Sequence, residues 1–237
     1  LEALRATVTG ELEIDGRMTE VDTVGWLEDV RKRLAVQDRD IAPAVQPDGL
    51  EGTLRDYQLQ GLRWMTQLVD LQLGGILADD MGLGKTVMLI ALHLQRTAIS
   101  SSPTLVVCPA SVLGNWEREI KRFAPGVNVR RYHGPKRRLD GVTDGFLVTT
   151  YATMRSDAIE LSEHQPGWGL VVADEAQNIK NPHARTAQAI RGIPAQARLA
   201  LTGTPVENNL GELWAILDWT TPGLLGTYQQ FRNTWSR

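Results

Sequence analysis

The chain has 237 residues, 42% of them hydrophobic and 22% charged, which is the composition of an ordinary globular protein with a sizeable core. No apolar run approaches the roughly 18 residues of a membrane span, and the single cysteine excludes an internal disulfide, so we expect an intracellular protein with no membrane partner. The formal net charge of −3 neither indicates nor excludes binding to nucleic acid.

The first 40 residues have the character of a separate N-terminal appendage. Residues 1–50 carry 6 basic and 11 acidic side chains, whereas residues 51–237 carry 19 basic and 17 acidic ones. Residues 41–53 contain two prolines and two glycines, which is typical of a linker. We therefore predict an appendage at 1–40, a linker at 41–53 and one larger domain at 54–237.

Two local patterns stand out within the appendage. Glu11–Ile14 alternates between polar and apolar residues and is followed by Asp15-Gly16, which predicts a β-hairpin. A helix is then predicted by an apolar stripe at Leu27, Val30 and Leu34.

From Leu54 onward, short apolar segments alternate with helical patterns. The predicted strands span residues 74–78, 104–108, 127–132, 146–150, 169–173 and 198–202. The predicted helices span residues 55–71, 85–98, 111–123, 151–162, 183–191 and 209–219. This alternation predicts an α/β fold, with a mostly parallel sheet flanked by helices on both faces. Ligands of such sheets bind at the carboxyl ends of the strands.

The segment Leu54–Gln58 opens the first predicted helix. A glutamine amide offers both a donor and an acceptor, which suits the edge of an adenine ring. Arg55, Tyr57 and Gln58 are therefore candidates for nucleotide binding. The start of an amphipathic helix would explain the same residues equally well.

The segment Leu77–Thr86 has the features of a phosphate-binding loop between a strand and a helix. Glycines let backbone N–H groups point at phosphate, and the helix N-terminus adds its positive end. Lys85 would place its charge on the outer phosphates, and the Thr86 hydroxyl would ligate Mg²⁺. The strict pattern has glycine where this chain has Asp79, so an accidental Gly-Lys-Thr is the alternative. The candidate nucleotide-binding residues are Asp80, Met81, Gly82, Leu83, Gly84, Lys85 and Thr86.

The segment Leu170–Gln177 places two adjacent carboxylates at the end of an apolar strand. In a phosphoryl-transfer site Asp174 would hold Mg²⁺, and Glu175 would orient or deprotonate the attacking water. A solvated Asp-Glu pair at a strand end is the alternative. The upstream Gly-Lys-Thr loop favours the catalytic interpretation.

The last signal, Thr202-Gly203-Thr204, again follows an apolar strand. Its hydroxyl groups are placed to donate hydrogen bonds to the carboxylates of Asp174 and Glu175 and to report the state of the nucleotide to other surfaces. A simple turn is the alternative.

These four signals, in this order, resemble the motifs of the first RecA-like lobe of helicase-superfamily-2 ATPases. The amino-acid sequences of these motifs are similar to those of the Swi/Snf-like family of DNA-translocating ATPases. The resemblance covers about residues 54–232, and that family has aspartate at the position of Asp79. The segments that carry it are LRDYQLQGLRWM, LADDMGLGKTVM, LVVCPASVLGNWEREI, LVTTYATM, VVADEAQNIKNP and LTGTPVENNLGELWAILDWTTPGLLG.

The resemblance implies a RecA-like P-loop NTPase lobe that uses ATP and Mg²⁺, with Lys85, Asp174 and Glu175 in catalysis. It implies a DNA-dependent ATPase that translocates on double-stranded DNA and remodels or displaces a DNA-bound protein. Gln177 with Thr202, Gly203 and Thr204 would couple the nucleotide to the DNA. The residues that would face DNA are Pro109, Ala110, Ser111, Asn115, Thr149, Thr150 and Tyr151.

A basic stretch follows the first of these DNA-facing segments. Residues 115–140 hold eight basic and three acidic residues, and their position favours a peripheral contact with the DNA backbone over a merely solvated face. The basic residues are Arg118, Lys121, Arg122, Arg130, Arg131, Lys136, Arg137 and Arg138.

The chain departs from the family pattern in two respects. Gln177 stands where many relatives have histidine, and glutamine forms hydrogen bonds but does not titrate near neutral pH. The family also has a second RecA-like lobe, which supplies arginines to the γ-phosphate and which we expect to lie outside this chain.

Two other functions remain open from the sequence. One is a superfamily-2 helicase lobe that separates RNA or DNA strands. The other is a nucleotide-dependent binding module without turnover, although the presence of Lys85, Thr86, Asp174 and Glu175 speaks against it.

Overall fold

The computed structural model divides the chain into two compact units, Leu1–Pro43 and Ala44–Arg237. The residues that it describes are 11–14, 17–20, 45–80, 82–206 and 209–235. In the first unit, β1 (Glu11–Ile14) pairs with β2 (Arg17–Glu20) in antiparallel register, which confirms the predicted hairpin. The helix predicted from Leu27 to Leu34 lies outside the described residues.

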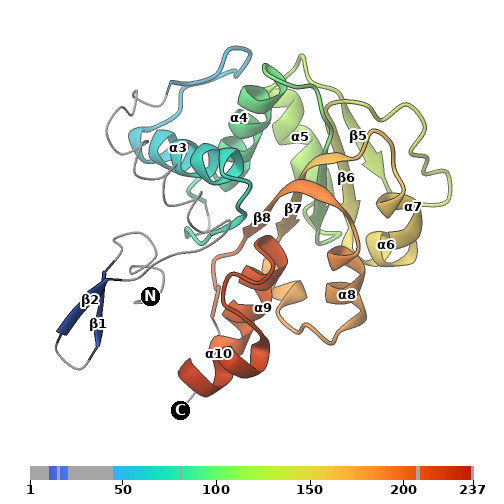
Figure 1. Cartoon of the computed structure of the whole chain (residues 1–237). Helices are drawn as coiled ribbons and strands as arrows, with labels where there is room; N and C mark the ends of the chain where they lie inside the picture. The colour runs from blue at the N-terminus through green and yellow to red at the C-terminus, as the bar shows by residue number, and fades with distance from the viewer. Residues whose placement is uncertain (1–10, 15–16, 21–44, 81, 207–208, 236–237) are drawn as a thin grey trace. The chain divides into compact units, whose positions relative to one another are not determined.

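The second unit is built on a six-stranded sheet in the order β3-β8-β7-β4-β6-β5, and every neighbouring pair is parallel (Figure 1). The strands are β3 (Gly75–Leu77), β4 (Thr104–Cys108), β5 (Val129–Tyr132), β6 (Phe146–Thr150), β7 (Trp168–Asp174) and β8 (Ala195–Leu201). The helices are α3 (Asp56–Asp70), α4 (Lys85–Thr97), α5 (Leu113–Phe123), α6 (Tyr151–Ser156), α7 (Ala158–Ser162), α8 (Arg185–Arg191), α9 (Leu210–Thr220) and α10 (Tyr228–Trp235), with the 3₁₀ helix η1 (Ala176–Ile179) after β7.

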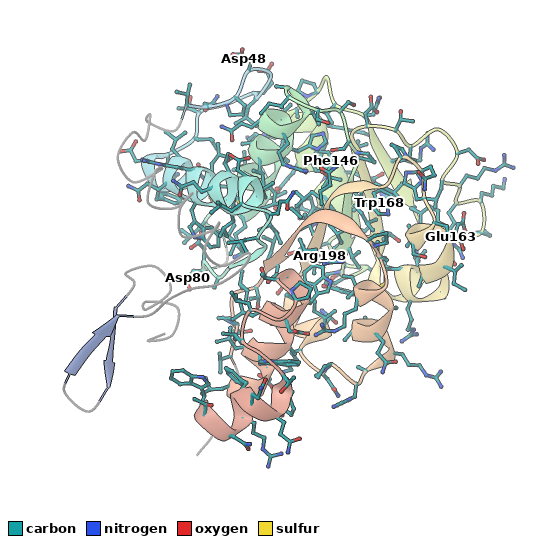
Figure 2. The ribbon with its side chains drawn as sticks, in the orientation of Figure 1. Asp48, Asp80, Phe146, Glu163, Trp168 and Arg198 are labelled. Atoms are coloured by element: carbon teal, nitrogen blue, oxygen red, sulfur yellow. The ribbon has the colours of Figure 1, made fainter. Side chains whose placement is uncertain are left out.

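The sheet has helices on both faces because its strands alternate their apolar side chains between two cores. Val106 of β4 lies in a core shared with α3, α4 and α5, and Val107 lies in a core shared with α6 to α9. Figure 2 labels one buried aromatic residue from each core, Phe146 in the first and Trp168 in the second. The predicted fold, a RecA-like sheet between two helical layers, is confirmed.

Two predicted strands, residues 104–108 and 146–150, have the observed bounds. The predicted helix 151–162 is wrong in its middle, where the helix breaks at Asp157 and continues as α7. The carboxylate of Asp157 accepts hydrogen bonds from the Arg137 guanidinium and the Tyr132 hydroxyl, so these long-range contacts hold the residue at the break. The sequence prediction missed η1 and α10.

Part of the predicted linker packs onto the second unit. The Gln46 side chain closes residues 46–54 into a compact loop, since its Oε1 accepts from the Leu54 N–H at 2.8 Å and its Nε2 donates to the Gly52 carbonyl at 2.7 Å. Leu50 and Leu54 are buried in the core beneath α4 and α5. These residues therefore belong physically to the larger unit, whereas residues 41–44 lie outside the described part.

Cys108 ends β4 and is fully buried. Its thiol donates to the Thr149 carbonyl at 3.5 Å, and burial raises the pKa of the thiol to about 12. A thiol buried in apolar surroundings with a raised pKa is a weak nucleophile. Within the described residues, no helix is long and apolar enough to cross a membrane.

Candidate nucleotide-binding site

The parallel sheet brings the predicted motifs to one edge, because the carboxyl ends of all its strands point the same way. In the sheet, Leu201 of β8 lies between Leu77 of β3 and Asp174 of β7. The loop after β3, the threonines after β8 and the carboxylates of β7 are therefore neighbours. The segments predicted to face DNA lie at or just after the carboxyl ends of β4 and β6, the next two strands of the sheet.

The loop after β3 curls around the side chain of Lys85. The Lys85 ammonium donates to the carbonyls of Asp79 and Asp80 at 2.6 and 3.0 Å, which holds it inside the curve of the loop. Gly84 is in the left-handed region and is the N-cap of α4, whose first turn has no acidic residue and includes Thr86. The positive end of the helix therefore faces the loop, and no acidic side chain in the helix's own first turn offsets it. Met81 lies outside the described residues.

The start of α3 is fastened to the same loop. The Leu83 carbonyl accepts from Gln58 Nε2 at 3.1 Å and from the Tyr57 hydroxyl at 3.2 Å. Gln58 Oε1 accepts from the Arg55 N–H at 2.9 Å, so the amide uses its acceptor and one donor within the protein. Gln58 is buried, while Arg55 and Tyr57 are exposed beside it. The structure thus gives Gln58 a positioning contact that the adenine hypothesis did not include.

Gly84 allows this close approach of helix and loop. A Cβ built at Gly84 would lie 2.4 Å from Gln58 Nε2, and the residue has φ of +82°. We expect Gly84→Ala to lower the free energy of unfolding by at least about 2 kcal/mol, because backbone strain and the clash add. Gly82→Ala is the matched variant, since Gly82 also has positive φ but a Cβ there would meet nothing within 4 Å. Equal losses in urea denaturation would contradict the role of the clash.

Asp174 ends β7 with both carboxylate oxygens hydrogen bonded. Oδ2 accepts from the indole N–H of Trp116 at 2.7 Å, and Oδ1 accepts from the Glu175 N–H at 3.0 Å. Burial raises the pKa of Asp174, and the Trp116 hydrogen bond and the charge of Lys85 act in the opposite direction. A carboxylate partly withdrawn from water gains more from a nearby cation than an exposed one does.

Glu175 adopts a backbone conformation that is rare for a residue other than glycine. Its φ and ψ are 53° and 60°, in the left-handed region. Asn178 supports it, because its backbone N–H and its side-chain amide both donate to the Glu175 carbonyl, at 3.0 and 2.8 Å. The carboxylate accepts from Gln177 Nε2 at 2.9 Å. Such backbone strain in a residue other than glycine is typical of functional sites.

Thr202 reaches this site through Gln177. Its hydroxyl donates to Gln177 Oε1 at 3.0 Å and accepts from the Thr204 N–H at 3.0 Å. The predicted direct bond from a threonine to a carboxylate is therefore wrong for Thr202. The longer Gln177 side chain lies between them and forms hydrogen bonds with both the Thr202 hydroxyl and the Glu175 carboxylate. Gly203 lies in the turn between the two threonines.

The side chains predicted to face DNA fall into two groups. Thr149 and Thr150 are buried, and their hydroxyls donate to the Tyr132 carbonyl and the Thr153 hydroxyl. Tyr151 is also buried and donates to the Asp174 carbonyl at 2.7 Å. The predicted side-chain contact with DNA is therefore corrected for these three residues, since their hydroxyl groups are used within the protein. The Thr149 hydroxyl links β6 to β5, that of Thr150 caps α6, and that of Tyr151 links α6 to the end of β7.

The second group is more accessible. Ala110, Ser111 and Asn115 are exposed and Pro109 is partly exposed, after β4 and at the start of α5. The basic residues nearby are partly neutralised, because Arg131 pairs with Glu117 and Arg137 with Asp157. Lys121, Lys136 and Arg138 are exposed.

Two residues that shape the site, Trp116 and Asn178, were not predicted from the sequence. The structural role of Tyr151 was not predicted either. Trp116 has the apolar spacing of a core residue, which hides the function of its N–H group. Its place beside Asn115 in the family-like segment was the available signal. Nothing local in the sequence marks the contact of Tyr151 with Asp174.

Comparison with known proteins now identifies the family. The family model described as SNF2-related domain matches residues 57–237. This chain belongs to that family. The Swi/Snf-like resemblance expected from the motifs is therefore confirmed.

Solved structures and curated proteins are similar to this SNF2-related domain. The Sulfolobus solfataricus SWI2/SNF2 ATPase core in complex with dsDNA is 40% identical, with a TM-score of 0.74, over 80% of this chain and 40% of that one. The putative ATP-dependent helicase/translocase YwqA of Bacillus subtilis is 42% identical over 76% of this chain. ATP-dependent DNA helicase DDM1 of Arabidopsis thaliana is 36% identical over 77% of this chain.

The domain spans only a part of these relatives. The aligned region is 20% of YwqA and 25% of DDM1. The activity and the partners of a whole protein that carries this domain are therefore proposals.

Proposed function

We propose that this chain is the ATP-binding lobe of a DNA-dependent ATPase that translocates on double-stranded DNA to remodel or displace DNA-bound proteins. The observation that carries the proposal is the convergence of the Lys85 loop and the Asp174–Glu175 pair at the ends of nearby parallel strands. Similarity to an ATPase core in complex with dsDNA supports the choice of DNA.

Phosphate binding is assigned to the loop and the first turn of α4. Backbone N–H groups from Asp80 to Thr86 and the helix N-terminus would receive the phosphates. Lys85 would exchange its bonds with the Asp79 and Asp80 carbonyls for the outer phosphate oxygens. Arg55 and Tyr57, exposed at the start of α3, would lie against the base, and Gln58 would keep the loop in place while offering its remaining amide proton.

The residues present fit a magnesium ion. Asp174 gives each of its oxygens to one N–H group, which leaves lone pairs for a hard cation, and Thr86 supplies a hydroxyl oxygen. Held by Asp174 and Thr86, the ion would supply positive charge beside the phosphates. Glu175 would orient or deprotonate the attacking water, and its carboxylate is held by Gln177 Nε2.

Coupling is assigned to the chain of bonds from Glu175 through Gln177 to Thr202, Gly203 and Thr204. The exposed segment Pro109–Ser111, with Asn115, would face the phosphates of one DNA strand. A second RecA-like lobe would complete the site and the DNA groove. With ATP and DNA as its ligands, the protein would act inside the cell.

Replacing Lys85 tests the nucleotide site. We expect Lys85→Ala to weaken binding of Mg²⁺-ATP by about 100-fold or more, because the phosphates lose their main counter-charge in the loop. The measurement is titration of the chain with a fluorescent ATP analogue. Arg232→Ala is the control, since Arg232 is exposed on α10 at the far end of the chain. Unchanged affinity in a folded Lys85→Ala variant would refute the site.

A strand-displacement assay on the protein that carries this domain separates translocation from unwinding. A duplex translocase should hydrolyse ATP in response to duplex DNA without releasing a hybridised strand. Release of the strand would instead favour a helicase.

A further inference from the structure

Asp174 is held on its side chain and on its backbone by two aromatic residues from different helices. Trp116, on α5, donates to its Oδ2 at 2.7 Å. Tyr151, the first residue of α6, donates to its carbonyl at 2.7 Å. Neither contact was expected from the nucleotide motifs, since both aromatic residues lie far from Asp174 in the sequence.

The chemistry and the burial of the Trp116 indole make its hydrogen bond to Asp174 a fixed contact. The indole has one N–H donor and no acceptor, so it orients a carboxylate oxygen without competing for a proton or a metal. The side chain is 2% exposed and belongs to the core between the sheet and α3, α4 and α5. The Glu175 N–H fixes the other oxygen at 3.0 Å. The two N–H groups together fix the rotation of the carboxylate about its Cβ–Cγ bond.

We propose that Trp116 is a positioning residue that aims the Asp174 carboxylate at the magnesium ion, an inference that rests on the proposed function of this site. Donors behind a metal-binding side chain set its orientation, and their loss weakens metal affinity. Trp116 also lies on the helix that begins after Pro109–Ser111.

Trp116→Phe in the 237-residue chain tests the inference. The phenyl ring keeps most of the apolar contact but removes the N–H group. We expect the Mg²⁺ concentration that half-maximally enhances binding of a fluorescent ATP analogue to rise about 10–100-fold. Binding of the same analogue in EDTA should match that of the unchanged chain, because the single N–H donor of the Trp116 side chain goes to Asp174.

Trp168→Phe is the matched control. Trp168 is also 2% exposed, and its indole N–H donates to the Leu161 carbonyl at 2.8 Å, in the other core. This variant should lose comparable stability in urea denaturation and keep the Mg²⁺ midpoint of the unchanged chain. An equal shift in both variants would show that Trp116 acts through packing alone and would overturn the proposal.

A normal Mg²⁺ midpoint in folded Trp116→Phe would overturn it as well. If Trp116→Phe does not fold, 3-benzothienylalanine at position 116 keeps the two-ring shape without the N–H group, and the same shift is expected. Failure of the unchanged chain to bind the analogue at any Mg²⁺ concentration would overturn the proposed function, and the role of Trp116 with it.

Discussion

Glu175→Gln in the protein that carries this domain is expected to retain ATP and to lower its hydrolysis at least about 100-fold, the lower range of what a general base contributes. The amide is nearly isosteric with the carboxylate but does not accept a proton from water. Its carbonyl oxygen can still accept from Gln177 Nε2, so the bond of 2.9 Å and the local backbone turn should survive.

Two measurements together decide this prediction: affinity for a fluorescent ATP analogue and steady-state release of phosphate. Glu163→Gln is the control, because Glu163 is exposed after α7. This substitution makes the same chemical change elsewhere in the chain. Near-normal turnover of Glu175→Gln would remove Glu175 from the role of water activation. Loss of ATP binding would place it in nucleotide binding instead.

The second large effect is expected from adding the second lobe. The described residues near the phosphate loop offer Lys85 as a cation, while transition-state charge on the γ-phosphate calls for further stabilisation. Arginine fingers in related machines contribute about 10³–10⁵ in rate. We therefore expect this chain by itself to hydrolyse ATP negligibly and a longer protein with the second lobe to show hydrolysis stimulated by duplex DNA.

The comparison requires phosphate release by both proteins, with and without duplex DNA. The 237-residue chain should also bind duplex DNA weakly, with an affinity that falls steeply as salt rises, because its contacts would be to phosphates. Full DNA-stimulated turnover by this chain alone would mean that the catalytic arginine lies within it. Turnover that stays negligible after a second lobe is added would contradict the assignment of the missing arginine to that lobe.

The sequence predicted the layers and most of the strands well, because buried parallel strands appear as short apolar runs. It predicted the nucleotide motifs because their residues are contiguous. Contacts between distant segments could not be predicted from the sequence, and the hydrogen bond from Trp116 to Asp174 is an example. The roles of hydroxyl-bearing residues were also ambiguous in the sequence. Thr150 lies at a strand end, where a hydroxyl can bind phosphate, yet it caps α6 by accepting from the Thr153 N–H.

The order of the strands in the sheet has a consequence for folding during translation. β3, which leads into the phosphate loop, pairs in the sheet with β8, and the Gly74 N–H before it donates to the Thr221 hydroxyl. Its partners are therefore synthesised near the end of the lobe, on the order of ten seconds after β3 at common translation rates. A nascent chain can assemble β4 and β6 earlier, but β3 gains its neighbouring strand in the sheet only when β8 emerges. Acquisition of ATP binding should thus be among the last steps of co-translational folding.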